Sequence, residues 1–453
     1  MKHPLTRIKY FLNKQFIDLK KGGIKTLIKK ITIFIKLAIN IVNPFYYFAI
    51  ILLFFSYLIR PFFLIRWDIL HSEKIGHFAA NTEIYCCKKD FLINVPKKKH
   101  IDLFCLGEKV CNKQLALMWK RELNILPRYI LYPVIVINNI VSKLHKGSSI
   151  HQIHIKEDIY SIEDNEKLKR VSTHRDLHSL IPKTGPHLNF TRDEILKGEK
   201  YLKEFGLKEN SKIVCLIVRD SAYEKSYLSN ADLDLSYNDY RDQNISEYMP
   251  AAEELTKRGY WVFRMGKVAS KAIKSSNPRI IDYANSRIKN DFLDIYLGYK
   301  CKFCIRTAGY GAVPQIFRKP ILYIEGPMAD LQGNEKQDLI LLPHYYSKIK
   351  KRKLTISEIF REGVCDIRTT EGYKNLGIEV QHNTSEEIKD VVIEMVERLE
   401  GIWKENFEDL SLQKSFFEIF EKNLIFYNKR KLFGEIKVRQ SSNFIKKNTF
   451  WLK

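Results

Sequence analysis

The sequence predicts an α/β protein of two lobes that follows a basic, apolar N-terminal segment. After Arg66, short apolar runs alternate with polar, helix-like segments, which is the pattern of βαβ units around a mostly parallel sheet. The 453 residues are enough for two or three domains of about 100–200 residues each. With 45% apolar and 28% charged residues, the composition is that of a globular chain and excludes a disordered one.

The charge balance is strongly basic, with 76 Lys and Arg against 52 Asp and Glu. Such an excess indicates an anionic partner: nucleic acid, acidic lipid or a phosphorylated substrate. A genome rich in A and T would also contribute lysines, and this alternative stays open. The charge is concentrated, because residues 1–66 hold twelve Lys and Arg and a single acid, Asp18. No nucleic-acid-binding motif is present, so we do not expect a nucleic-acid partner.

Residues 1–66 form the predicted membrane-associating segment. The apolar stretch 44–59 is shorter than the roughly 20 residues that a spanning helix needs. Before it, residues 24–42 mix Ile and Leu with lysines, as an interfacial amphipathic helix does. We therefore favour a monotopic segment over a single span, with a buried core helix as a third alternative. In either membrane reading the basic arm stays cytoplasmic and touches anionic lipid.

The cysteines fit a reducing compartment and predict no metal site. Cys301 and Cys304 have C-x-x-C spacing, but no second pair accompanies them. On a strand, positions three apart face opposite sides, so the two thiols would not easily share an ion.

Residues 67–185 are predicted to form the first α/β lobe. Leu103–Leu106 is an apolar run typical of a strand, while 129–137 fits a strand or a helix. A polar stretch at 145–187 marks the boundary with the second lobe.

Residues 186–400 are predicted to form a doubly wound second lobe, followed by a helical, basic tail at 401–453. Thr191 and Glu194 have capping-box spacing at the first helix, and Ile213–Val218 reads as a strand buried on both faces. Further strands are expected at 261–265, 280–283, 303–305 and 321–324, with helices at 247–258, 291–298 and 312–317. Two more capping boxes begin at Thr355 and Thr384.

Ligands of open α/β sheets bind where loops leave the carboxyl ends of strands. The loop after 303–305 carries Thr307, Gly309 and Gly311, whose small size lets backbone amides approach a diphosphate. After 261–265, Arg264 and Lys267 are cations suited to phosphate. A purely structural glycine turn and ordinary surface charge are the alternatives.

Two residues are candidate general bases. Asp220 follows Arg219 at the end of a buried strand and leads into a polar loop with Tyr237, Asp239, Tyr240 and Asp242. His77 lies in the first loop of the first lobe. The alternatives are a helix cap or an ion pair with Arg219 for Asp220, and a structural role for His77.

Several stretches resemble a family of bacterial glycosyltransferases from O-antigen and capsule clusters. They are VCLIVRDSAYEKSYLSNADLDLSYNDYRDQ, IIDYANS, DFLDIYLGYKCKFCI, AVPQIFRKPILYI and IGHFAANTEIY, within residues 66–400. The resemblance implies two Rossmann-like lobes of the GT-B type, with the nucleotide-sugar donor bound by the second lobe and no metal or separate cofactor required.

The basic, apolar N-terminal segment and the residues of the loops lead to a hypothesis for location, partners and site. We expect a peripheral or monotopic enzyme at the cytoplasmic side of the inner membrane, acting on a lipid-linked or polysaccharide acceptor. Arg219, Arg264, Lys267, Thr307, Gly309 and Gly311 would bind the donor, and Asp220 or His77 would be the base. The alternative is a non-catalytic binding protein of polysaccharide assembly with the same fold.

Overall fold

The computed structural model describes residues 43–144, 146–153, 157–163, 167–173, 176, 178–220, 222, 236–307, 311–326, 337–427 and 438–453. Residues 24–42, Gly309 and most of the polar loop after Asp220 lie outside this part. The chain divides into two compact units. Unit 1 comprises 1–69, 96–105 and 124–153, and unit 2 comprises 70–95, 106–123 and 154–453. Each unit is described by itself.

Unit 1 pairs two helices with a small sheet. Its elements are α2 (Pro44–Ile59), β1 (Leu64–Leu70), β2 (His100–Leu106) and α5 (Arg128–Leu144). The ambiguous stretch at 129–137 is therefore helical. A buried bidentate ion pair joins the two strands, in which the Arg66 guanidinium donates to both carboxylate oxygens of Asp102 at 2.7 and 2.6 Å.

Helix α2 begins at Asn43, whose side chain accepts from the Phe45 amide, and has Pro44 in its first turn. Ala49 and Leu53 are buried in a cluster with residues of α5. The other side of α2 is exposed, which makes the buried-core-helix alternative wrong; its exposed large apolar residues are Phe45, Tyr47, Phe48, Ile50, Ile51, Leu52, Phe54, Phe55, Leu58 and Ile59. Among the described residues, no helix has the length and apolar character needed to cross a bilayer.

Unit 2 is built on a parallel sheet, which confirms the predicted α/β fold. Among the described residues the sheet has seven strands in the order β7-β6-β5-β8-β9-β10-β14, each parallel to its neighbours. Their bounds are β5 (Lys212–Ile217), β6 (Tyr260–Arg264), β7 (Ile280–Ile281), β8 (Phe303–Arg306), β9 (Ile321–Ile324), β10 (Leu339–Leu341) and β14 (Arg439–Gln440).

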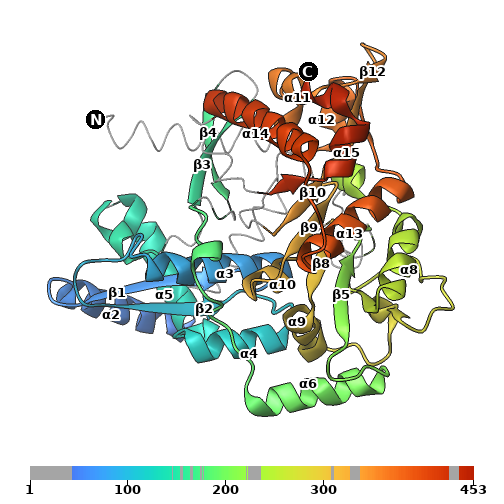
Figure 1. Ribbon diagram of the computed structural model, residues 1–453. Coiled ribbons are helices and arrows are strands. Elements are labelled where there is room, and N and C mark those ends of the chain that lie inside the picture. The colour runs from blue at the N-terminus through green and yellow to red at the C-terminus, as the bar shows by residue number, and fades with distance from the viewer. Residues whose placement is uncertain are drawn as a thin grey trace, which may run out of the picture. The chain divides into compact units, whose positions relative to one another are not determined.

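Helices lie on both faces of this sheet (Figure 1). Helix α8 packs on β6, and α13 packs on α8, β9 and β10, whereas α9 contacts β5, α4, α6 and α10. Their bounds are α3 (Ile75–Asp90), α4 (Lys113–Glu122), α6 (Arg192–Glu204), α8 (Met249–Lys257), α9 (Asp291–Lys300), α10 (Ala312–Ile316) and α13 (Ser385–Leu399). The predicted capping boxes at Thr191, Thr355 and Thr384 are all formed.

The remaining elements of unit 2 are peripheral to the sheet. They are the hairpin β3 (Glu157–Glu163) and β4 (Lys167–Thr173), the antiparallel strands β11 (His344–Ser347), β12 (Arg352–Lys353) and β13 (Ile378–Gln381), and the helices α11 (Ile356–Arg361), α12 (Thr370–Asn375), α14 (Phe407–Tyr427) and α15 (Ser442–Lys447). The C-terminal residues pack into the unit, because β14 extends the sheet beside β10 and Trp451 is buried.

Candidate functional site

The strand order places a topological switch point between β5 and β8. From β5 the chain adds β6 and β7 on one side, and from β8 it adds β9 and β10 on the other. The loops that leave the carboxyl ends of β5 and β8 therefore run apart, and ligands of doubly wound sheets bind in the crevice between such loops.

One hydrogen bond joins the two loops at this point. The Arg219 amide, after β5, donates to Thr307 Oγ1, after β8, at 2.7 Å. Thr307 is itself held by its amide, which donates to the Ile217 carbonyl at 3.0 Å. The Arg219 guanidinium pairs with Asp242, and the Gln243 amide donates to the Arg219 carbonyl. The polar loop after Asp220 thus returns to the switch point.

Asp220 and Arg264 are engaged with one another and with the surrounding loops. The Asp220 carboxylate accepts from the Ala222 amide at 3.0 Å and from the amide and hydroxyl of Ser270 at 2.9 and 3.0 Å. Arg264 is 2% exposed and lies 3.6 Å from both Asp220 and Asp282. The ion pair expected between Asp220 and Arg219 is therefore wrong, because Asp220 pairs with Arg264 and Arg219 pairs with Asp242. Their roles as base and as phosphate ligand stay predictions.

Of the loop that follows β8, the structure describes Thr307 at one end and Gly311 at the other. Gly311 precedes α10, and a Cβ at this position would lie 2.2 Å from Arg306 Cδ. A side chain at position 311 would therefore require the Arg306 side chain to move. The Arg306 guanidinium lies 4.9 Å from the centroid of the Tyr323 ring, which is within cation–π range.

Sequence reasoning missed an acid–imidazole pair at the same edge of the sheet. Glu325 follows β9 with a left-handed φ of 52°, and its buried carboxylate accepts from the Asn383 amide and from His382 Nδ1. The hydrogen bond with Glu325 raises the pKa of His382, burial opposes this, and the charge of Asp242 adds to it. His382 keeps 43% of its side chain exposed, so the raised pKa favours the cationic form of a ring that solvent reaches. The available signal was Glu325-Gly326 directly after a predicted strand.

The other predicted site residues lie on different elements. Lys267 is exposed in the loop after β6, and its ammonium donates to the Cys111 carbonyl at 3.1 Å. His77 is half-buried in the first turn of α3. The structure thus brings together Arg219, Asp220, Arg264 and Thr307 around the ends of β5, β6 and β8.

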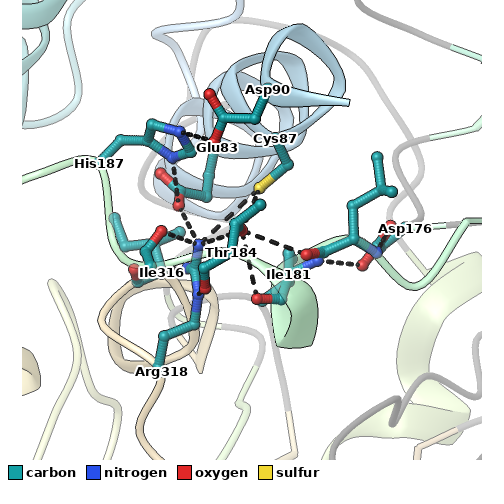
Figure 2. A network of polar contacts seen from close by, with 11 residues as sticks. Glu83, Cys87, Asp90, Asp176, Ile181, Thr184, His187, Ile316 and Arg318 are labelled. Atoms are coloured by element: carbon teal, nitrogen blue, oxygen red, sulfur yellow. Dashed lines mark hydrogen bonds and ion pairs between the residues drawn. The ribbon is translucent and has the colours of Figure 1, made fainter. Parts of the chain in front are cut away.

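A second polar cluster connects α3 with Arg318, which lies two residues after α10 (Figure 2). Arg318 donates to Glu83 at 2.6 Å and to the Thr184 hydroxyl at 2.9 Å, and Glu83 has no exposed side-chain surface. His187 bridges Glu83 and Asp90, at 2.9 Å from each. Burial opposes a charge on His187, but its contacts with Cys87, Glu83 and Asp90 raise the pKa of the imidazole to about 10.

This cluster has the composition of a metal site but already contains its own cations. The ligand atoms of Glu83, Cys87 and His187 lie within 4.8 Å of one another. The Arg318 guanidinium contacts both Glu83 Oε1 and Cys87 Sγ, and His187 is protonated at neutral pH. A divalent ion would have to displace the guanidinium and remove that proton. We therefore interpret the cluster as a set of ion pairs that holds α3 in place.

Cys301 and Cys304, the C-x-x-C pair, are both fully buried in the apolar core. Cys301 ends α9 and Cys304 lies in β8, and none of the eight cysteines, each in the described part of the chain, forms a disulfide. Burial raises the pKa of Cys304 well above its ordinary value, which disfavours the thiolate that a metal requires.

Comparison with known proteins identifies no family for this chain. No protein-family model matches the chain, and no curated protein matches it. A solved structure described as the glycosyl transferase family 9 from Veillonella parvula is similar, with 9% identity over 74% of this chain and 96% of that one, and a TM-score of 0.37. This TM-score is too low to transfer an activity from one chain to the other.

Proposed function

We propose that this chain is a nucleotide-sugar-dependent glycosyltransferase whose donor binds at the switch point of the unit 2 sheet. The observation that carries the proposal is the hydrogen bond between Arg219 and Thr307, which fastens together the two loops that diverge from β5 and β8. A nucleotide diphosphate is the ligand for which such a crevice is most often used. The sequence resemblance supports sugar transfer as the reaction.

Positive charge at this edge of the sheet supports a diphosphate ligand. His382, whose pKa is raised, is 43% exposed, Arg306 ends β8, and Arg219 follows the neighbouring strand β5. Charge-assisted hydrogen bonds to phosphate are about twice as strong as neutral ones. We propose that these cations bind the diphosphate without a resident metal ion, as the resemblance implies.

Arg264 and Asp220 have different roles in this proposal. Arg264 is buried between two carboxylates, so it positions the loops after β5 and β6 rather than meeting the donor directly. Asp220 is oriented by the same contacts. For Asp220 to act as base, a hydroxyl of the acceptor would compete with Ser270 for the carboxylate; His77 is the other candidate. We propose a lipid-linked or polysaccharide acceptor at the cytoplasmic face of the inner membrane.

A thermal-shift panel of UDP-, GDP-, CMP- and dTDP-sugars and the bare nucleotides tests the donor site. A ligand at one hundred times its Kd stabilises the folded state by about 2.7 kcal/mol, so one nucleotide class should raise the Tm of the full chain. His382→Gln should weaken that nucleotide about tenfold, because a charged hydrogen bond is lost. His178→Gln, at an exposed histidine that is not part of the proposed site, is the matched control.

The alternative is a non-catalytic binding protein of polysaccharide assembly. Such a protein would have the same fold and bind the donor, but it would not transfer the sugar. Donor binding without release of nucleotide, by wild-type protein supplied with membrane-extracted acceptor, would favour it. A flat response of the folded protein to the whole panel would contradict the donor site itself.

A further inference from the structure

We propose that the outer face of α2, together with Phe62, is a docking surface that lies flat in an anionic lipid bilayer. This inference concerns unit 1 and does not depend on the proposed transfer reaction. Ten of the sixteen residues of α2 are large apolar side chains that are at least 37% exposed. The most exposed are Phe54, Leu58 and Tyr47, at 64, 60 and 58%, and Phe62 beyond the helix is 83% exposed.

The chemistry of this face excludes water as its ordinary surroundings. A surface helix of a soluble domain carries charged or polar residues on its outer side, whereas α2 contains no charged residue at all. Single exposed apolar residues are common on proteins, but a contiguous set of this size marks an interaction site. Phe, Tyr, Leu and Ile together are the residues that enter the boundary between headgroups and acyl chains.

The inner side of α2 fixes how the helix would lie. Ala49 and Leu53 are buried against α5, and the Tyr57 hydroxyl donates to Asn138 at 2.7 Å. The Phe45 and Tyr129 rings, 5.1 Å apart, join the beginnings of the two helices, so α2 and α5 run in the same direction along their length. A helix of 16 residues is about 24 Å long, less than the roughly 30 Å of a bilayer core. With one side fastened to unit 1, α2 presents only its outer side to lipid.

Charge beside α2 selects an anionic bilayer as the occupant. Arg60 ends the helix, and the Lys98 ammonium donates to the Arg60 carbonyl at 3.2 Å. Lys97 and Lys99 are exposed on either side of Lys98, so a group of four cations lies at one end of the apolar face. The segment that precedes α2 is also strongly basic. Cations at the rim of an apolar face are the arrangement that binds acidic headgroups.

Flotation of the full-length protein with vesicles tests the proposal. Wild-type protein should float with vesicles of phosphatidylcholine and phosphatidylglycerol in a 7:3 ratio, and much less with phosphatidylcholine alone. Phe54→Glu with Leu58→Glu should lower partitioning about a hundredfold, since each buried apolar side chain contributes about tenfold or more. The control is Ile349→Glu with Ile402→Glu, at positions 80 and 57% exposed in unit 2, which should float like wild type.

The lysines provide a second, independent variant. Lys97, Lys98 and Lys99 changed together to Gln should reduce binding to the anionic vesicles and leave the weak binding to neutral ones unchanged. Because all substituted side chains are exposed, the variants should keep the wild-type Tm, and nucleotide stabilisation should persist in each folded variant. Equal flotation of wild type and Phe54→Glu/Leu58→Glu would overturn the proposal. Failure of wild type to float, with a dimer in light scattering that the same variant dissociates, would overturn it in favour of a second copy.

Discussion

Truncation of Arg318 tests whether the buried ion pairs around Glu83 hold α3 in place and stabilise the fold. Arg318 donates to Glu83, to the hydroxyl and carbonyl of Thr184, and to the Gly185 carbonyl, at distances from 2.6 to 3.0 Å. Arg318→Ala removes these bonds and leaves the fully buried Glu83 carboxylate beside His187. Removal of one partner from a buried ion pair costs about 3–5 kcal/mol. Because His187 still offsets part of the charge, we expect the lower end, about 3 kcal/mol.

Urea unfolding followed by tryptophan fluorescence measures this loss. Arg318→Lys should recover part of the stability, because an ammonium keeps the charge but not the planar fork of donors. Glu83→Gln combined with Arg318→Ala completes a double-mutant cycle, in which we expect a coupling of about 2 kcal/mol. Arg361→Ala, at an exposed arginine of α11, is the matched control and should change stability by less than about 0.5 kcal/mol. An Arg318→Ala protein as stable as this control would refute the reasoning.

Three further predictions concern the same unit. The contacts of His187 raise its folded-state pKa to about 10, so its contribution to stability is complete below pH 6.5 and is lost as the pH rises toward 10. The stability of His187→Gln, measured by urea unfolding, should lack that part of the pH dependence. Gly311→Ala places a Cβ against the preceding side chain and should weaken nucleotide binding in the thermal-shift assay, whereas Gly185→Ala, with open space around it, should not. Thr307→Val leaves the Arg219 amide without its acceptor and should cost about 1–3 kcal/mol in urea unfolding, most of which Thr307→Ser restores.

The elements that the sequence predicts are those with local signals. Strand 321–324 and the helix at 291–298 are marked by apolar runs and capping residues, and the structure has them as β9 and α9 within two residues. The three capping boxes are also local, because each joins residues three apart. Strand β14 could not be found in this way, since its short segment becomes a strand by pairing with β10 about one hundred residues earlier.

The candidate site shows the same division. Arg219 and Thr307 were predicted from their positions after apolar strands, and the parallel sheet brings them together although 88 residues separate them. Glu325 and His382 are 57 residues apart, and Glu83 and Arg318 are 235 apart. Such pairs leave no periodicity in a single sequence. For Arg264, the residue type predicts a phosphate ligand, and its burial between two carboxylates is a long-range contact that the sequence does not indicate; its role stays a prediction.

Amide hydrogen exchange with and without a nucleotide-sugar tests the location of the donor site most directly. The nucleotide-sugar that most raises the Tm would be used, at a concentration that saturates the protein. We predict slower exchange in peptides that cover residues 218–222 and 306–316, with no change in peptides from α2. Unchanged exchange in both of these loop segments, with protection elsewhere in the chain, would contradict the donor site at the switch point.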